Sequence, residues 1–463
     1  MGPGASRGFS MGPGGSGGVS MGPGGSPGGE GSPGGSLAVR IGEGRALRAL
    51  GGWELVRALL VLRLCAHPWL VDNAETLLRG SRRVLPLPLW RGLLALSLFG
   101  QFAVGRGQRA VRGVAERLRG RGLRPMLALP LEGEGPEGEG ESWFEANRGA
   151  ALQCVGLAAG AGPEPAMQLK VTALLSHRLC EKLSQRLAEP GGAGLSPDKM
   201  AAVMGGQIPN FPGLSPPENR HLGGALRRLD DVIKAAVAGG VRVLVDAELS
   251  HLNPALTCVT LGLMWRHNRQ GALPWVWNTY QAYLQDAEGR LRADSALCAE
   301  VGVAFGAKLV RGAYLEHERA RAAAGGRQPP TWGSPELTSA SFRRCLDWLL
   351  PLLPLPRSRL GVVVATHNEA SVLHTARRME ELSLPRSGGP VCFAQLLGMG
   401  DHISLALGEL GFQVYKSVPV GPPEVTVPYL ARRAAENRGA LGGARREREL
   451  LGAELRRRLR PWQ

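Results

Sequence analysis

Residues 241–247 have the sequence VRVLVDA, a short run of β-branched residues that ends beside an aspartate. Such a run predicts a buried strand. Seven similar runs occur elsewhere, and the segments between them are longer, several with a clear helical period. The eight predicted strands are Met126–Leu131, Met167–Ala173, Val241–Ala247, Trp275–Tyr280, Val303–Val310, Gly361–Thr366, Val391–Leu396 and Phe412–Ser417.

This alternation predicts the fold class. Strands separated by segments long enough for crossover helices pair in parallel. Eight such units fit an α/β protein with a closed (β/α)8 barrel better than an open doubly wound sheet. The acidic segment Glu132–Ser142 and the Gly/Pro-rich segment Gly191–Pro217 would be loops after the first two strands, at the end of a barrel where active sites are built.

The chain divides by composition into four segments. Residues 1–40 are rich in Gly, Ser and Pro, repeat MGPG, and can bury almost no apolar surface, so we expect a disordered tail. Residues 45–121 have helical spacing and predict a helical arm. The catalytic barrel would span 122–440, and a basic C-terminal helix 441–463. A G-x-G-x-x-G match in the tail lacks a preceding strand and a following helix, so it predicts no Rossmann fold.

The formal net charge is +16, from 55 Lys and Arg against 39 Asp and Glu. This charge would suit nucleic acid, an anionic membrane or a basic organelle matrix. Arginines concentrate in Arg106–Arg124 and Arg445–Arg460, each of which could be a solvated face or a membrane-surface helix. Because few aromatic residues accompany them and no RNA- or DNA-binding signature occurs, we expect no nucleic-acid partner.

The remaining composition excludes other classes. Seven cysteines are scattered without a C-x-x-C pair, and nine histidines show no ligand spacing, so we expect neither a disulfide framework nor a metal site. Charges and prolines interrupt the apolar stretches Trp53–Val71 and Leu85–Val104, and neither predicts a membrane span.

Polar residues follow the predicted strands where barrel geometry directs them to the active site. For any single one, a solvated loop position or a structural ion pair is an equally ordinary role. Lys170 and Asp246 follow adjacent strands, and we expect them to form a salt bridge, because buried charges persist when paired. The other candidates at strand ends are Gln281, Lys308, Arg311, Tyr314, Thr366, His367 and Asn368.

A second set lies on one predicted helical face near the C-terminus. Tyr429, Arg432, Arg433 and Glu436 are spaced i, i+3, i+4 and i+7. Two adjacent arginines after the last strand could clamp a carboxylate. From spacing alone, a surface helix with local ion pairs is the alternative.

Four motifs resemble the proline dehydrogenase family, in the same order: KLVRGAYLEHERARA (308–322), ATHNEASV (365–372), QLLGMGDHISLALG (395–408) and PYLARRAAEN (428–437). The resemblance extends from about Pro125 to Arg460. It implies a distorted (β/α)8 barrel that binds FAD without a Rossmann fold.

The resemblance also implies roles for individual residues. Arg432 and Arg433 would bind the substrate carboxylate near Lys170, with Asp246 and Glu436 anchoring these cations. Leu396 and Tyr429 would enclose the substrate ring. The implied flavin contacts are Gln281, Lys308, Arg311, Gly312, Ala313, Tyr314, Thr366, His367 and Asn368; Lys308 stands where many bacterial relatives have arginine.

Ser417 departs from the family pattern. Proline dehydrogenases typically have a tyrosine at this position, whose ring closes over the substrate near C4. A hydroxyl at C4 would clash with that ring, whereas serine leaves room and offers a hydrogen bond. The chain therefore resembles the branch that oxidises hydroxyproline, with neutral variation at this position as the alternative.

The implied reaction is oxidation of trans-4-hydroxy-L-proline to Δ1-pyrroline-3-hydroxy-5-carboxylate, by hydride transfer from ring C5 to flavin N5. The resemblance suggests a quinone acceptor and a location on the matrix side of the mitochondrial inner membrane. The basic C-terminal helix would offer peripheral contact with that membrane. The alternative is a proline dehydrogenase with proline as its main substrate.

Overall fold

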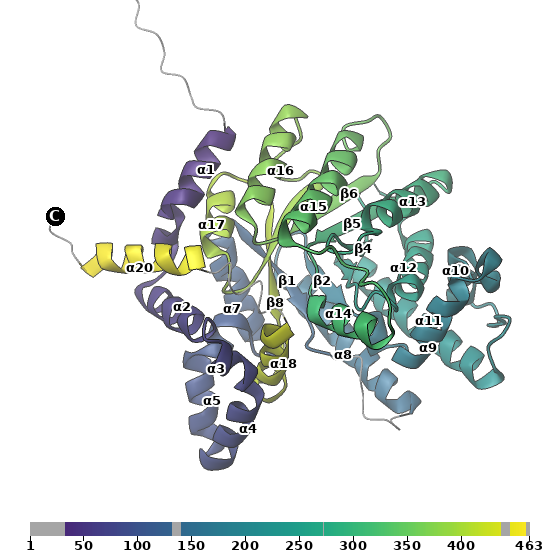
Figure 1. Cartoon of the computed structure of the whole chain (residues 1–463), viewed down its shortest axis with the longest axis horizontal. Helices are drawn as coiled ribbons and strands as arrows, with labels where there is room; N and C mark the ends of the chain where they lie inside the picture. Colours follow the sequence, from purple (N-terminus) through teal and green to yellow (C-terminus); the bar gives the residue numbers. More distant parts are fainter. Residues whose placement is uncertain (1–32, 132–139, 272, 437–444, 460–463) are drawn as a thin grey trace, which may run out of the picture. The chain divides into compact units, whose positions relative to one another are not determined.

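The computed structural model describes residues 33–131, 140–271, 273–436 and 445–459, all of which belong to one compact unit. Figure 1 shows its strands gathered at the centre with helices around them. The predicted tail up to residue 32 and the predicted loop at 132–139 lie outside the described residues.

Eight parallel strands form a closed barrel in chain order, each paired with the next and β8 paired with β1, which confirms the predicted fold. Parallel neighbours joined by helices bury both faces of each strand. The strands are β1 Leu123–Ala128, β2 Ala166–Leu169, β3 Arg242–Val245, β4 Val276–Gln281, β5 Phe305–Val310, β6 Leu360–Ala365, β7 Val391–Leu396 and β8 Val414–Pro419.

The predicted limits coincide with the observed ones for β7 and differ by one to four residues in the other seven strands, most of all in β1 and β2. β1 begins at Leu123 rather than Met126, because it pairs along the whole of β8 and tolerates Pro125 within the strand. β2 ends at Leu169 rather than Ala173, because the chain turns at Lys170 into a short 3-10 helix, η2 (Val171–Ala173).

The inside of the barrel is apolar towards the amino ends of the strands. Trp277 of β4 fills this layer together with Leu244, Val363 and Tyr415. Gly306 of β5 and Gly361 of β6 pair in register opposite the tryptophan, and a Cβ atom at either position would overlap its ring. Only glycine leaves room for the indole there. At the amino ends of the strands, Arg124 of β1 and Arg242 of β3 pair with Glu164, and the other polar side chains of the interior lie towards the carboxyl ends.

Helices surround this barrel. They are α8 Glu141–Ala159, α9 His177–Leu187, α10 Pro197–Met204, α11 Pro216–Ala238, α12 Asn253–His267, α13 Ala287–Glu300, α14 Leu315–Ala324, α15 Pro335–Leu349, α16 Glu369–Glu381, α17 Asp401–Glu409 and α18 Pro423–Glu436, with two further 3-10 turns, η3 Pro190–Gly194 and η4 Leu350–Leu352. Ser176, Ser215, Ser334 and Asn368 cap α9, α11, α15 and α16 through their side-chain oxygens.

The segment before β1 is helical. It contains α1 Pro33–Glu43, η1 Arg45–Ala49, α2 Gly52–Leu64, α3 Pro68–Asp72, α4 Ala74–Val84, α5 Leu87–Leu96, α6 Leu98–Phe102 and α7 Gln108–Arg119. α1 begins inside the segment predicted to be disordered, so that prediction is wrong for residues 33–40. Leu37 and Ile41, four residues apart, are buried against the barrel helices α16 and α17, which the Gly-rich residues before them could not achieve.

The last described helix, α20 (Arg445–Leu459), packs against α2 and α17 rather than standing apart. Leu450 and Leu451 are buried. The carboxylate of Glu447 accepts hydrogen bonds from the backbone amides of Gly400 and Asp401 at the start of α17, both at 2.8 Å. One face of the basic C-terminal helix is thus part of the folded core. The division into arm, barrel and C-terminal helix remains our proposal.

We predict that Gly361→Ala lowers the free energy of unfolding by roughly 1–3 kcal/mol, because the new methyl group overpacks Trp277. Urea denaturation followed by far-UV circular dichroism measures the change. Gly289→Ala is the matched control, since a Cβ atom at this position in α13 meets open space. An unchanged denaturation midpoint for Gly361→Ala would contradict the assignment of Trp277 as the filler of this layer.

Candidate active site

A chain of polar contacts crosses the inside of the barrel at the carboxyl ends of the strands. The buried ammonium of Lys308 on β5 pairs with Asp246, which follows β3. Asp246 Oδ1 also accepts a hydrogen bond from Gln168 Nε2 of β2 at 3.3 Å. Gln168 Oε1 in turn accepts from Ser417 Oγ of β8 at 2.5 Å. Four side chains, each on or directly after a different strand, are therefore linked in one network. Gln168 is the member that the sequence analysis did not predict.

The expected salt bridge between Lys170 and Asp246 is not formed, and that prediction is wrong. The β2–β3 register pairs Leu169 with Val245, and the Asp246 amide donates to Leu169 O at 2.9 Å, so Asp246 follows β3 beside Lys170. The Asp246 carboxylate nevertheless binds Lys308 and Gln168 instead. The acid that interacts electrostatically with Lys170 is Glu248, two positions after Asp246. The carboxylate of Glu248 is buried and accepts two hydrogen bonds of 2.8 Å from Thr172.

Glu248 and Lys170 affect each other's ionisation. Burial raises the pKa of Glu248, although the Lys170 ammonium and the Thr172 hydroxyl oppose the shift. Burial by itself would lower the pKa of Lys170, but the phenol oxygens of Tyr429 and Tyr314 and the Glu248 carboxylate outweigh it, and the pKa rises. Lys170 is therefore a cation at neutral pH. Glu248 could have been predicted from the sequence. It stands two residues after Asp246, and side chains two residues apart on an extended segment point to the same side.

Lys170 and Arg433 meet around two tyrosines. The Lys170 ammonium lies 5.6 Å from the ring centroid of Tyr429 on α18. The Arg433 guanidinium lies 5.4 Å from the ring of Tyr314, which follows β5, and 5.7 Å from that of Tyr429. Arg433 Nη1 also donates to the Tyr314 hydroxyl at 3.2 Å. Two cations beside aromatic rings can bind a carboxylate that is attached to a small apolar group.

The phenol of Tyr314 remains protonated in this setting. Burial raises its pKa to about 12, against the opposing effect of Lys170 and Arg433. Tyr314 is thus a hydrogen-bonding wall of the cluster rather than a proton acceptor at neutral pH.

Arg432 and Glu436 lie differently from Arg433. Arg432 Nη1 is 3.7 Å from Glu75 Oε1 of α4, which connects α18 to the segment before the barrel. Glu436 is the last residue of α18, and its side chain lies outside the described residues, so its predicted anchoring role stays a prediction.

His367 lies beyond β6 and is exposed to solvent. Its Nε2 accepts a hydrogen bond from the Leu396 amide at 3.1 Å, which leaves the proton on Nδ1. The surrounding protein atoms and the Lys416 ammonium lower the pKa of His367 to about 4. The imidazole is therefore neutral at neutral pH. Gly400, at φ 63°, approaches the ring so closely that a Cβ atom would lie 2.9 Å from it.

Two other side chains predicted to contact the flavin, Gln281 and Arg311, form hydrogen bonds within the protein. The buried amide of Gln281 donates to Glu248 O at 3.1 Å and accepts from Asn253 at 2.8 Å, so it fixes the loop after β3. Arg311 donates to Ser339 Oγ and Pro335 O. Burial lowers the pKa of Arg311, while Glu336 opposes the shift.

The remaining residues predicted to contact the flavin lie in the loops after β5 and β6. Gly312, at φ 130°, lies against the Tyr283 ring, where any Cβ would overlap it, and Ala313 follows half-buried. Thr366 Oγ1 accepts from the Asn368 amide at 3.1 Å, and Asn368 caps α16.

Leu396 and Ser417 are partners across β7 and β8. Leu396 is an apolar side chain that is 47% exposed at the end of its strand, whereas Ser417 is buried beside it. An exposed leucine next to a hydroxyl provides an apolar and a polar contact for a small ligand. Within the described residues, no group of three or more His, Cys, Asp and Glu side chains could hold a metal ion.

The chain is similar to known proteins over most of its length. Hydroxyproline dehydrogenase of Bos taurus is 48% identical over 89% of this chain and 91% of that protein. Proline dehydrogenase 1, mitochondrial, of Bos taurus is 33% identical over 89% of this chain and 88% of that protein.

Among solved structures, proline utilization A (PutA) from Bdellovibrio bacteriovorus inactivated by N-propargylglycine superposes with a TM-score of 0.59 at 19% identity, over 90% of this chain and 39% of that one. This similarity shows the fold. Residues 115–446, which include all eight strands and α18, match the family model described as proline dehydrogenase. The cations, the polar network and the neighbouring leucine described above thus lie in an oxidoreductase, and this chain belongs to the proline dehydrogenase family.

Proposed function

We propose that this chain oxidises trans-4-hydroxy-L-proline to Δ1-pyrroline-3-hydroxy-5-carboxylate. The observation that carries the proposal is the polar network that ends at Ser417. The higher identity to a hydroxyproline dehydrogenase, 48%, than to a proline dehydrogenase, 33%, supports the same choice.

The network fixes the direction of each hydrogen bond. The Asp246 carboxylate pairs with Lys308 and can only accept, so the Gln168 group that faces it must be the NH2. The Gln168 carbonyl therefore faces Ser417, whose hydroxyl must donate to it. The remaining lone pairs of Ser417 Oγ are free to accept. A substrate hydroxyl at C4 would donate to them.

Residues of α18 and at the ends of β2 and β7 would bind the rest of the substrate. Arg433 and Lys170 would bind the carboxylate, with Arg432 nearby on the same helix. Tyr429 and Leu396 would enclose the ring. Fixing one end of the substrate in this way orients C5 for reaction. A serine in place of an aromatic wall should weaken proline binding by roughly 1–3 kcal/mol through lost apolar contact.

The residues beyond β5 and β6 suit FAD. Lys308 and Arg311 supply positive charge for an electron-rich ring and a diphosphate, while the exposed His367 offers an Nδ1–H donor. When bound, FAD would accept the hydride from ring C5 at its N5 atom. Lys308 would stabilise the negative charge that develops there, and Asp246 keeps Lys308 in place.

We further propose that the electrons pass to a quinone and that the protein works on the matrix side of the mitochondrial inner membrane. The printed name of the Bos taurus proline dehydrogenase 1 includes the word mitochondrial, which supports this location. The alternative function is oxidation of proline as the main substrate. Comparison of kcat/KM for trans-4-hydroxy-L-proline and L-proline decides between them.

The first prediction concerns the cofactor and substrate together. Purified protein should absorb at flavin wavelengths, and trans-4-hydroxy-L-proline added without oxygen should bleach this absorbance, because the ring is reduced. L-proline should bleach it more slowly. A colourless protein that stays colourless after incubation with FAD would contradict the proposal.

The second prediction concerns Ser417. In Ser417→Ala, kcat/KM for trans-4-hydroxy-L-proline should fall about 5- to 10-fold with little change for proline, because one hydrogen bond is lost and no bulk is added. In Ser417→Tyr, the preference should reverse towards proline, because the ring excludes the C4 hydroxyl. Steady-state kinetics with both substrates measure this. If neither variant changed the ratio of the two kcat/KM values, Ser417 would not determine specificity.

The third prediction concerns Arg433. Arg433→Lys should raise KM for the substrate by at least about 10-fold, because a lysine keeps the charge but loses the planar pair of donors. The same change at Arg343, an exposed residue of α15, is the control and should leave KM unchanged. Equal KM values for Arg433→Lys and the unmodified protein would exclude Arg433 from carboxylate binding.

A further inference from the structure

The helices that precede the barrel expose an unusual number of large apolar side chains. Three of them, Trp53, Leu60 and Leu64, lie on α2, and a longer run of seven follows within 28 consecutive residues of α3, α4 and α5. Their exposed fractions are Trp69 64%, Leu77 44%, Val84 82%, Leu87 41%, Leu89 53%, Leu93 49% and Leu96 57%. Soluble proteins rarely leave such a concentration uncovered without a binding role.

On α5, the exposed apolar side chains lie together on one face of the helix. Trp90 and Leu94 are buried on one side of the helix, where they pack with Val427 of α18. Leu89, Leu93 and Leu96, spaced i, i+4 and i+7, form a separate apolar stripe that no other element covers in the described structure. The helix is therefore apolar on two faces, and the fold uses only one of them.

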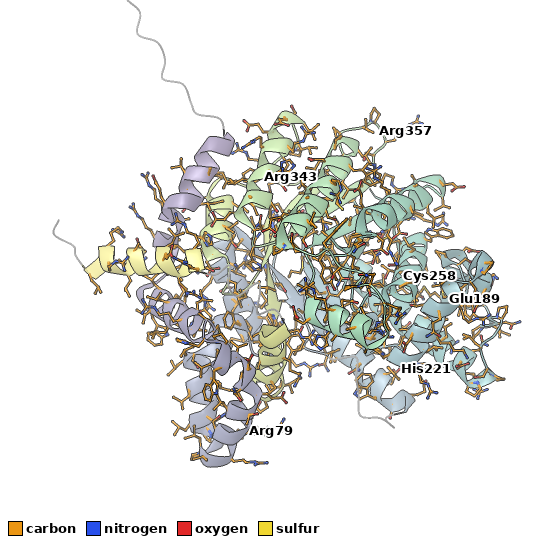
Figure 2. The ribbon with its side chains drawn as sticks, in the orientation of Figure 1. Arg79, Glu189, His221, Cys258, Arg343 and Arg357 are labelled. Carbon is orange, nitrogen blue, oxygen red and sulfur yellow. The ribbon has the colours of Figure 1, made fainter. Side chains whose placement is uncertain are left out.

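Arginines accompany the exposed apolar residues. Residues 68–102 contain four arginines and two acids, Asp72 and Glu75, a net charge of +2. Arg82 and Arg83 at the end of α4 are exposed, and no carboxylate of a described residue lies within salt-bridge distance of either. Figure 2 shows Arg79 of α4 at the lower edge of the view, far from Arg343 and Arg357 at the top.

We propose that α4 and α5, with Trp69 of α3, form a docking surface for an anionic phospholipid bilayer. Exposed leucines beside arginines match the two parts of such a surface, acyl chains and phosphate groups. α4 and α5 have 11 and 10 residues, and no helix among the described residues is long and apolar enough to cross a membrane. The two helices therefore lie in the interface.

Charge favours a bilayer over a second copy of this chain. A two-fold dimer would bring the same surface of both subunits together, and with it the arginines of both. An anionic bilayer attracts these arginines instead. The C-terminal helix α20 keeps an exposed basic face, but its residues Leu450 and Leu451 are buried against the core, so the apolar part of the proposed contact lies on α4 and α5.

This surface is directly connected to the helix that carries Tyr429 and Arg433. Arg91 of α5 pairs with Glu424 at the start of α18, and Glu75 of α4 lies 3.7 Å from Arg432. Docking would thus hold α18 close to the lipid, where an apolar electron acceptor dissolves. That consequence rests on the proposed function, whereas the docking itself does not.

Sedimentation of the full chain with vesicles tests the docking. The protein should bind vesicles of phosphatidylcholine with phosphatidylserine more strongly than vesicles of phosphatidylcholine alone. Leu89→Ser with Leu93→Ser should reduce the partition coefficient at least about 10-fold, because both side chains would lie in the interface. Leu337→Ser with Leu355→Ser, which changes two equally exposed leucines elsewhere, should have no effect.

The charge is tested in the same assay. Arg82→Gln with Arg83→Gln should weaken binding to the anionic vesicles about 5-fold for each arginine, whereas Arg343→Gln with Arg357→Gln should not. Oxidation with a soluble dye as acceptor should be the same in all four double variants, which separates docking from the chemistry. Unchanged vesicle binding in the Leu89/Leu93 and Arg82/Arg83 double variants would overturn the proposal. So would a loss of dimers in the leucine variant by light scattering, since a second copy would then cover the surface.

Discussion

The buried ammonium of Lys308 is the constraint on which the polar interior depends. A cation inside a barrel is stable only beside an anion, and Asp246 supplies it. Once Asp246 is committed to Lys308, its remaining capacity orients the Gln168 amide, and Gln168 orients the Ser417 hydroxyl. The Ser417 hydroxyl, which we propose meets the substrate ring, is thus positioned by a charge across the barrel through the side chains of Asp246 and Gln168.

Packing beneath this network makes it possible. Trp277 and its neighbours fill the amino end of the barrel, with glycines at 306 and 361 leaving the space that the indole needs. Lys308 is buried, so its attraction to Asp246 is stronger than it would be in bulk water. The apolar layer and the polar network are therefore two parts of one arrangement, and the period-2 pattern of the strands produces both.

The sequence predicted the strands well because period-2 and helical patterns are local properties. β7 was predicted at its observed limits, and β1 was displaced because Pro125 is unusual within a strand. The pairing of side chains was less predictable, because it depends on register. Lys170 and Asp246 follow adjacent strands side by side, yet the Asp246 carboxylate pairs with Lys308 across the barrel, and Lys170 interacts with Glu248. The roles of Arg433 and His367 came from family resemblance, since spacing alone equally allowed surface positions.

Glu447 links the C-terminal helix to the order in which parts of the chain fold. Its carboxylate accepts the amides of Gly400 and Asp401, at the turn that holds His367 in place. During synthesis, all eight strands are made before residue 447, and until then these two amides lack their acceptor. The barrel can close early, but the turn beside His367 gains this acceptor only after residue 447 has been translated. A shortened product of incomplete translation would contain every strand and still lack this part of the site.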